Sequence, residues 1–310
     1  MMYKLYPMHF EPIYKDAIWG GGRIAKKFHR SSVPPRCAES WEISDRIEGQ
    51  SSVINGPLKG KTLHELIEQF GEHLLGRGRK DQRFPLLIKI IDAREALSLQ
   101  VHPSEETAAI CRGEPKTEMW YVLEGGPVYA GFKKPVSRED WARAVDSNRL
   151  IDLIQEFQTK PGDVVFIPGG RIHAIGAGCM MLEVQQNSDT TYRVYDWNRM
   201  GVDSKPRALH LEQAKKCIKL DDDNDPITLP QLIEEDGDFK RWTILSTLFF
   251  SIEKWEVSGL YRVNADPKSF QVFFYLSGPQ KGLSTLLPAN SDPLDLQGPL
   301  SLLRIFVKDY

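Results

Sequence analysis

The chain has 310 residues, of which 41% are hydrophobic and 26% are charged, and its formal net charge is −2. These proportions are ordinary for a globular protein and exclude a disordered, collagen-like or disulfide-scaffold chain. A net charge this close to zero supplies no global positive field to draw the chain onto nucleic acid or an anionic membrane, although it is compatible with a local basic pocket.

The spacing of the cysteines and the length of the apolar runs indicate in which cellular compartment the protein is expected. The four cysteines are far apart and form no Cys-x-x-Cys pair, which excludes a thiolate zinc knuckle or a thioredoxin-type pair. No apolar run reaches the ~20 residues that a membrane-spanning helix needs, and the stretch from Met1 to Phe10 contains no signal-peptide core. We therefore expect a cytoplasmic protein with reduced thiols, either a monomer or a homodimer.

Helical patterns are few, and strand patterns dominate the chain. Helical spacing of apolar residues occurs at Thr62–Leu75, Ser137–Phe157 and Ala208–Ile218, with Thr62 and Ser137 as N-caps. Short β-forming runs separated by Gly and Pro predict a sandwich, jelly roll or barrel. In chain order these runs are Phe84–Ile91, Met119–Leu123, Val164–Ile167, Met180–Val184, Thr191–Tyr195, Val272–Leu276 and Leu302–Val307. The acidic stretch Asp221–Asp225 is interpreted as a linker between two halves.

Three stretches carry most of the chemistry. In Leu97–Pro103, Gln100 and His102 are two residues apart in a β-like run, so both side chains point to one face. The second stretch, Lys116–Gly125, opens a strand with Glu118. The third, Gly162–His173, reads as a strand, a Pro-Gly-Gly turn and then a histidine.

Each of these residues has an ordinary structural reading when it is taken alone, since a single His or a Glu at a strand start is usually a surface or core residue. Together, two His, one Glu and one Gln make a nitrogen and oxygen site suited to Zn²⁺, Fe²⁺, Mn²⁺ or Co²⁺. Gln is a poor zinc ligand by itself, and it could instead hydrogen-bond to a ligand.

The third stretch resembles the second motif of the cupin superfamily, G-x5-P-x-G-x2-H, at Gly162, Pro168, Gly170 and His173. The motif's trailing Asn is absent, because Ala177 occupies that position. The first cupin motif matches in its Glu-x6-Gly ending, but its His-x-His is replaced by Gln100-x-His102, and an insertion precedes Glu118.

This departure is typical of one cupin family, and the chain resembles the short bacterial form of type I phosphomannose isomerase (mannose-6-phosphate isomerase). Further matches carry the resemblance from about Trp19 to about Cys217. They are Trp19-Gly-Gly, Glu39-Ser-Trp-Glu-Ile-Ser44, Phe84–Asp92, Leu182–Asp196 and Arg207-Ala-Leu-His210.

The resemblance implies a mainly β protein with two cupin-type jelly-roll units and a small helical insert. We expect a catalytic domain over residues 1–220, with helical segments at about 62–75 and 137–158, and a smaller degenerate cupin-like domain over 221–310. Gly282 to Pro288 repeats the G-x5-P frame of Gly162 to Pro168. Because His210 is the last histidine, this second copy is expected to lack metal ligands.

The implied reaction interconverts D-mannose 6-phosphate and D-fructose 6-phosphate by moving a proton between C1 and C2 through an enediol. One Zn²⁺ per chain would be held by Gln100, His102, Glu118 and His173, and would polarise the carbonyl. Lys89 and Ser98, nine residues apart on neighbouring predicted strands, would bind the phosphate, so that remote binding energy orients the reacting carbons.

The resemblance also places Lys116 and Arg193 at the substrate. Lys116 shares a strand face with Glu118, and Asp189 could orient the Arg193 guanidinium, which would stabilise the charged enediolate or act in ring opening. The proton carrier is left open among a water on the metal, Asp189, Glu39 and Glu42. A turn residue is the alternative interpretation of Asp189.

Three other functions are compatible with these residues. An iron oxygenase usually presents a His-rich triad, whereas here a Gln replaces one His and lysines and an arginine surround the site. A cupin isomerase acting on glucose 6-phosphate would need the same enediol. A non-catalytic sugar-phosphate-binding cupin would be expected to have lost the ligand set, which this sequence retains.

Overall fold

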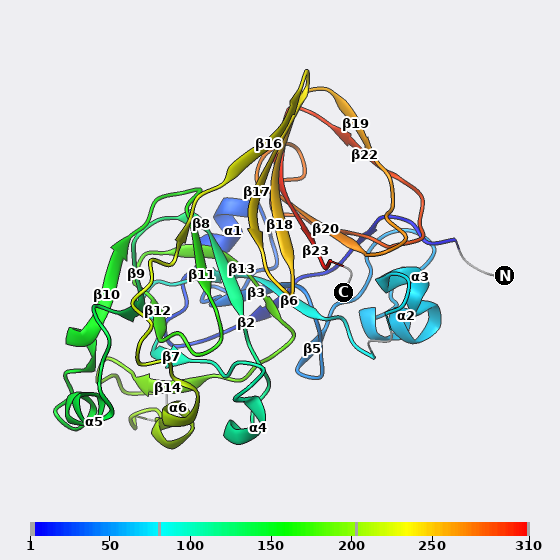
Figure 1. Cartoon of the computed structure of the whole chain (residues 1–310). Helices are drawn as coiled ribbons and strands as arrows, with labels where there is room; N and C mark the ends of the chain where they lie inside the picture. The colour runs from blue at the N-terminus through cyan, green and yellow to red at the C-terminus, as the bar shows by residue number, and fades with distance from the viewer. Residues whose placement is uncertain (1–3, 80–81, 202–203, 309–310) are drawn as a thin grey trace. The chain divides into compact units, whose positions relative to one another are not determined.

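The computed structural model describes residues 4–79, 82–201 and 204–308, so the first three residues of the N-terminal stretch considered above lie outside it. Strands far exceed helices in this part of the chain (Figure 1), which confirms the mainly β prediction. None of its helices is both long and apolar enough to cross a membrane.

Contacts within the chain define two compact units. The first contains the described residues of 4–13, 41–87 and 228–308, and the second those of 14–40 and 88–227. The division into domains of residues 1–220 and 221–310 stays a prediction, but the contacts place the 62–75 segment in the first unit, apart from the residues predicted to bind the metal.

The second unit is a two-sheet sandwich. The order of one sheet is β15 (Ile227–Thr228), β11 (Val164–Ile167), β8 (Glu118–Glu124), β13 (Met180–Gln186), β6 (Leu86–Asp92), β3 (Glu39–Ile43) and β2 (Ile13–Lys15). The order of the other is β10 (Ile154–Gln158), β9 (Pro127–Phe132), β12 (His173–Ile175), β7 (Leu99–Val101) and β14 (Tyr192–Tyr195).

An apolar core lies between these two sheets. Ile91, Trp120 and Met181 from the larger sheet pack in one buried cluster with Val128 and Ile175 from the smaller one. Successive side chains of a strand point to opposite faces, so each strand contributes alternate residues to this interior. On the same inward faces, Lys89, Glu118 and Glu183 replace apolar residues, and these polar positions mark the site.

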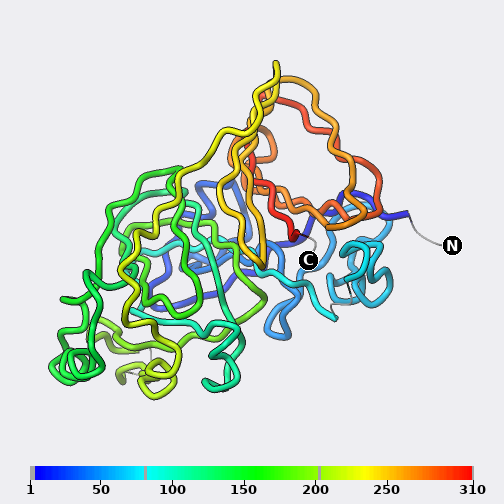
Figure 2. Tube along the Cα trace, viewed as in Figure 1, coloured from blue at the N-terminus to red at the C-terminus, as the bar shows by residue number. Residues whose placement is uncertain are grey.

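The first unit contains a sheet of order β1 (Met8–His9), β21 (Ser284–Leu287), β20 (Gln271–Tyr275), β23 (Leu300–Phe306), β18 (Ser251–Val257), β17 (Phe239–Ser246) and β16 (Gln231–Asp236). Figure 2 traces most of this sheet in yellow to red. Two small sheets accompany it: β19 (Leu260–Val263) with β22 (Leu294–Gln297), and β4 (Asp45–Arg46) with β5 (Gly49–Gln50).

The strand order supports the predicted internal repeat. Strand β11, which follows Gly162, pairs with β8, and β8 pairs with β13; in the same way β21, which follows Gly282, pairs with β20, and β20 pairs with β23. Both glycines have left-handed backbones, with φ of 93° and 83°, which glycine adopts without the Cβ penalty of other residues. The two G-x5-P frames therefore occupy equivalent positions in two similar three-strand arrangements.

The helices match the predictions at their N-termini better than at their C-termini. Thr62 caps α2 (Leu63–Phe70) in a capping box with Glu65, and α3 (Glu72–Leu75) follows. Ser137 caps α5 (Arg138–Asp146), but the predicted helix to Phe157 is wrong, because a short 3₁₀ turn, Leu150–Leu153, leads into strand β10. Helix α6 (Leu211–Cys217) agrees with its prediction, whereas α1 (Arg23–Phe28) and α4 (Ala108–Cys111) were not predicted.

The acidic stretch at 221–225 is not simply a solvated linker. Asp222 is buried and accepts two hydrogen bonds from the Arg171 guanidinium, at 2.7 and 2.8 Å. A carboxylate paired in this way anchors the segment to the second unit.

Candidate active site

Strand pairing brings the inward polar residues of β8 and β13 side by side. Glu183 is registered opposite Trp120, and Gln185 opposite Glu118. The Trp120 indole Nε1 donates a hydrogen bond of 2.8 Å to Glu183 Oε2, which holds this carboxylate in place between the sheets. Glu118 and Glu183 are diagonal neighbours on this face, since Glu183 lies two residues from the direct partner of Glu118, and diagonal pairs are within reach of long side chains.

His102, Glu118 and His173 form a fully buried group whose ligand atoms lie within 4.8 Å of one another. His102 Nε2 is 3.5 Å from Glu118 Oε2, and His173 Nε2 is 3.4 Å from Glu118 Oε1. Both ring nitrogens of His102 lack a hydrogen-bond partner among the described residues. Buried polar atoms are normally satisfied, so this convergence of unused lone pairs fits a bound cation.

The Pro-Gly-Gly turn orients His173. Gly170 has φ of 94°, and its N–H donates 2.8 Å to the His102 carbonyl, which ties the two histidine segments together. His173 Nδ1 donates to the Arg171 carbonyl at 2.9 Å, so Nε2 is left as the free lone pair that points at Glu118. Gln100 lies against the group, with its amide nitrogen 3.3 Å from His173 Nε2 and its amide oxygen 3.4 Å from the Ser98 hydroxyl.

The ionisation of this group suits metal binding. Burial, helped by the positive charge of Lys116, lowers the pKa of His102 to about 3, and burial also lowers the pKa of His173. Burial alone would raise the pKa of Glu118, but Lys116 and the histidines outweigh it and hold that pKa well below its usual range. Neutral imidazoles and an ionised carboxylate are the forms that bind cations.

Two lysines on the same side of the pocket are paired with carboxylates. Lys89 Nζ lies 3.1 Å from Glu183 and 3.3 Å from Glu39, and Lys116 Nζ lies 2.9 Å from Glu118. Burial alone would lower the pKa of Lys89, but Glu183, Glu39 and Glu118 outweigh it and raise that pKa. Both lysines are therefore already paired with carboxylates of the fold.

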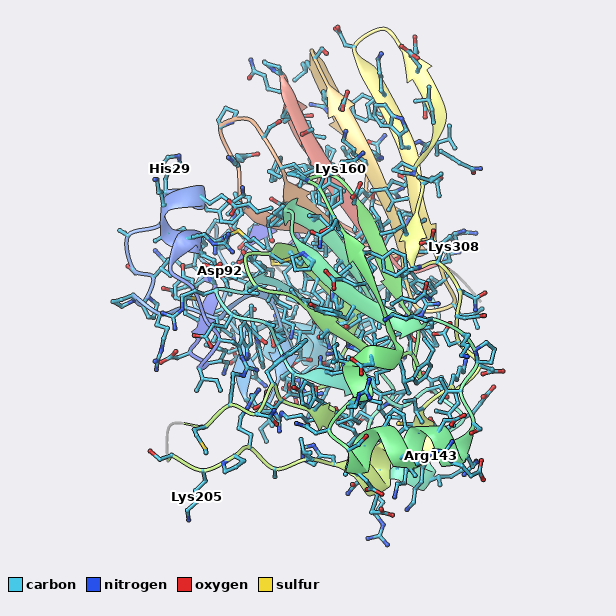
Figure 3. The ribbon with its side chains drawn as sticks, turned by 90° about the vertical axis from the view of Figure 1, so that its left-hand side faces the viewer. His29, Asp92, Arg143, Lys160, Lys205 and Lys308 are labelled. Atoms are coloured by element: carbon cyan, nitrogen blue, oxygen red, sulfur yellow. The ribbon has the colours of Figure 1, made fainter. Side chains whose placement is uncertain are left out.

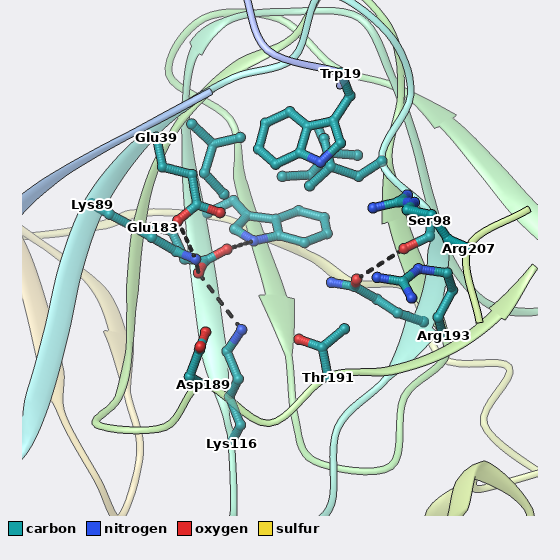
Figure 4. A pocket seen from close by; sticks show the side chains of 15 residues that line it. Trp19, Glu39, Lys89, Ser98, Lys116, Glu183, Asp189, Thr191, Arg193 and Arg207 are labelled. Carbon is teal, nitrogen blue, oxygen red and sulfur yellow. Dashed lines mark hydrogen bonds and ion pairs between the residues drawn. The ribbon is translucent and has the colours of Figure 1, made fainter. Parts of the chain in front are cut away.

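The opposite side of the pocket is built from Ser98, Arg193 and Arg207 (Figure 4). Arg193 donates from its guanidinium to the Ala208 carbonyl at 2.8 Å, while its buried Nε has no hydrogen-bond partner within the described part of the chain. Arg207 donates to both carboxylate oxygens of Asp196, at 2.7 and 2.5 Å. Burial, and the nearby positive charge of Arg207, lower the pKa of Arg193.

Every residue predicted for the site reaches it. Gln100 joins the His–Glu–His group, and a single pocket is lined by the residues predicted for substrate, namely Lys89, Ser98, Lys116, Asp189 and Arg193. Among the candidate proton carriers, Glu39 lines this pocket, whereas strand alternation places Glu42 on the other face of β3.

Two details of the prediction differ from the structure. Asp189 does not orient Arg193: in Figure 4 it lies beside Lys116, and the carboxylate that holds arginines is Asp196. Lys89 on β6 and Ser98, just before β7, belong to different sheets and face the pocket from opposite sides. Sequence spacing could not reveal this, because β6 and β7 follow each other in the chain without pairing.

Several lining residues had no predicted role, namely Trp19, Trp120, Glu183, Thr191 and Arg207. The signal for Glu183 was present, since Met181, Glu183 and Gln185 alternate on one strand and a carboxylate inside an apolar run is unusual. Arg207 belongs to the matched stretch Arg207-Ala-Leu-His210, but it lies outside any strand, so no alternation pattern pointed it to the pocket, where Asp196 holds it.

A two-sheet unit with a His–Glu–His group buried between its sheets has the architecture of a cupin with a metal site. A family model described as the catalytic domain of type I phosphomannose isomerase matches residues 8–122. The chain belongs to the type I phosphomannose isomerase family.

Individual relatives agree with this membership. The chain is 38% identical over 258 residues to mannose-6-phosphate isomerase ManA of Bacillus subtilis strain 168, covering 82% of this chain and 80% of the relative. It is 37% identical to the mannose-6-phosphate isomerase of Streptococcus mutans, covering 82% and 79%. A crystal structure of a mannose 6-phosphate isomerase from Bacillus subtilis superposes with a TM-score of 0.89 at 31% identity, covering 97% of this chain and 99% of that one.

Proposed function

We propose that this protein is a metal-dependent aldose–ketose isomerase that interconverts D-mannose 6-phosphate and D-fructose 6-phosphate. The observation that carries the proposal is a pocket lined by two lysines and two arginines next to the buried His–Glu–His group, to which the lining residue Lys116 is ion-paired through Glu118. Such a pocket supplies both requirements of the reaction, a Lewis acid for the carbonyl and cations for the phosphate.

We propose one Zn²⁺ per chain, held by His102, Glu118, His173 and Gln100. The unused lone pairs of His102 and the neutral imidazoles support a borderline cation, and nitrogen with carboxylate oxygen is a common zinc donor set. When bound, the ion would polarise the sugar carbonyl and stabilise negative charge on its oxygen.

The chain's own groups would handle the proton and the charge. Lys116 and Arg193 border the ligand group from two sides, so their donors would face the C1 and C2 oxygens of the open-chain sugar. Asp189 and Glu39 both line the pocket with carboxylates, and Asp189 is our candidate for moving the proton, since Glu39 is already paired with Lys89. Ser98 would donate to the phosphate, and Lys89 was the other residue predicted for that task.

The test is an isomerase assay joined to metal analysis. We expect the purified chain to contain zinc, to convert mannose 6-phosphate to fructose 6-phosphate, to lose that activity on chelation and to regain it with Zn²⁺. His102→Gln should abolish metal retention and activity together, because it removes an imidazole ligand. A chain that turns over mannose 6-phosphate undiminished after complete metal removal would contradict the proposal.

His29→Asn is the matched control for the histidine variant. His29 is exposed at the end of α1, on the outside of the ribbon in Figure 3, and its left-handed backbone (φ of 52°) suits asparagine. This variant should keep both zinc and activity.

Glucose 6-phosphate is the comparison substrate, because the same enediol serves both sugars. Faster turnover of glucose 6-phosphate would assign the pocket to that isomerisation, and binding of a sugar phosphate without turnover in the presence of zinc would indicate a non-catalytic module. We further propose a cytoplasmic location, which the four buried free cysteines support, and a monomer or homodimer.

A further inference from the structure

The two basic sides of the pocket differ in how their charges are balanced. On the side of the lysines, Lys89 and Lys116 face three carboxylates, those of Glu39, Glu118 and Glu183. An anion placed there would have to compete with these ion pairs for both lysines. This side is suited to a cation and to polar sugar oxygens.

The arginine side has the opposite balance. Asp196 is bonded to both Arg207 and Arg199, with Arg199 at 2.6 Å, and Glu95 lies 3.8 Å from Arg199. Arg193 has no ion-pair partner among the described residues and only a carbonyl for its guanidinium. Glu95 is also shared with Arg94, at 3.1 Å, so guanidinium groups outnumber carboxylates on this side. Two of these guanidinium groups, those of Arg193 and Arg207, line the pocket, where leaving partly buried positive charge without an anion is costly.

Strand register gives the position of this excess charge relative to the ligand group. His173 on β12, Gln100 on β7 and Arg193 on β14 are direct cross-strand partners, so the three residues form one row across adjacent strands. Two strand spacings separate the backbones of His173 and Arg193 by roughly 10 Å. A sugar whose C1 and C2 lie at the ligand group would extend its C6 phosphate toward the arginines.

We infer that Arg207, aimed by Asp196, binds the phosphate of the substrate together with Ser98, a task that the sequence suggested for Lys89. Asp196 occupies two of the donors of Arg207 and fixes the plane of its guanidinium, which leaves the remaining donors to the pocket. Ser98 lies on the same side, with its hydroxyl 3.4 Å from Gln100 Oε1. Arg207 is thus a binding residue, Asp196 a positioning residue, and Arg193 lies between the phosphate end and the reacting carbons.

This inference rests on the proposed isomerase activity, but it can be tested apart from that activity. Inorganic phosphate is the probe, measured as a competitive inhibitor of mannose 6-phosphate turnover and, independently, by calorimetric titration of the zinc-loaded protein. Loss of a charged hydrogen-bonded contact costs about 1.5–3 kcal/mol, so Arg207→Gln should weaken phosphate binding and raise KM roughly 10- to 100-fold. Its kcat and zinc content should stay near those of the wild type.

Arg36→Ala is the matched control, because Arg36 forms a similar two-point ion pair with Asp16 on the exposed surface of the same unit. It should change neither KM nor phosphate binding. Asp196→Asn should raise KM with kcat retained, and combining it with Arg207→Gln should add little, since both changes act on one contact. A double variant no worse than Arg207→Gln alone would indicate that Asp196 acts by positioning Arg207, whereas additive effects would indicate a general loss of stability.

The outcomes are distinct. If Arg207→Gln leaves phosphate binding unchanged, the inference is overturned. If Lys89→Gln abolishes phosphate binding, the inference is also overturned, and Lys89 is the phosphate ligand. If the wild type binds phosphate through Arg207 but turns over no hexose phosphate, the anion site stands and the proposed isomerase function fails.

Discussion

Residues of the same charge have different tasks in this pocket because their partners differ. Lys89 and Lys116 are each ion-paired with carboxylates, which cancel most of the field of the two charges. Arg193 has no carboxylate partner among the residues that the structure describes, and its buried Nε donates to none of them. An unpaired guanidinium next to a ligand residue is available for charge that develops during a reaction.

Arg193→Ala should therefore lower kcat by roughly 10²- to 10³-fold, the usual cost of removing one preorganised donor to a developing oxyanion. Zinc content should not change, because the residue belongs to the neighbouring strand and not to the ligand group. Steady-state kinetics with metal analysis measures both.

If Arg193→Ala raised KM and left kcat intact, Arg193 would be a second substrate-binding residue alongside Arg207. Arg193→Lys distinguishes charge from geometry, since a lysine keeps the charge but loses the planar pair of donors.

At the level of elements, the turn between β11 and β12 is stabilised by a residue about fifty positions later in the chain, Asp222. The Arg171 carbonyl accepts the His173 Nδ1 proton, and the Arg171 side chain is in turn held by Asp222. Burial alone would raise the pKa of Asp222, but the paired hydrogen bonds from Arg171 outweigh it and lower that pKa. The 221–225 stretch thus contributes to the orientation of a metal ligand.

Asp222→Asn should destabilise the protein by about 3 kcal/mol at neutral pH, because it leaves the buried Arg171 charge unpaired. A carboxyl whose pKa is lower in the folded state contributes stability above its unfolded pKa and loses it as the pH falls through the folded value. The difference in unfolding free energy between wild type and variant should therefore shrink below about pH 4. Denaturant titrations across pH measure it; a difference that is constant down to pH 2 would contradict the ion-pair explanation.

The sequence correctly predicted those helices and strands whose structure is determined by neighbouring residues in the chain. The capped starts of α2 and α5 and the strand Val164–Ile167 lie where capping residues and β-branched runs indicate. The segment from Ile154 to Phe157 has helical spacing of apolar residues, yet it forms β10 because pairing with β9 outweighs propensity. Arg207 was missed because its place in the pocket depends on the Asp196 carboxylate, which no local pattern reveals.

At the level of the whole molecule, the ligand group joins both sheets of the second unit. Glu118 comes from the larger sheet, whereas His173 and Gln100 come from the smaller one. An ion held by all of them would link the sheets, and a ligand that binds only the folded state stabilises it by mass action.

Chelation should accordingly lower the melting temperature by several degrees, because zinc at 100 to 1,000 times its Kd contributes about 3–4 kcal/mol. Scanning calorimetry with and without a chelator measures the change. His102→Gln should melt at one temperature whether or not zinc is added, and a zinc-dependent shift in that variant would place the stabilising ion elsewhere.

The row of His173, Gln100 and Arg193 also limits how this chain can vary in length. Strand β7 has only three residues, and its central residue, Gln100, is registered with both neighbours. Inserting or deleting one residue there would turn Gln100 away from the pocket and move its partners out of line at once. By contrast, the segment between His102 and Glu118, which contains α4, lies outside the strands that carry these two predicted ligands. Length differences among homologues should therefore accumulate in that connection, while β7 keeps its length.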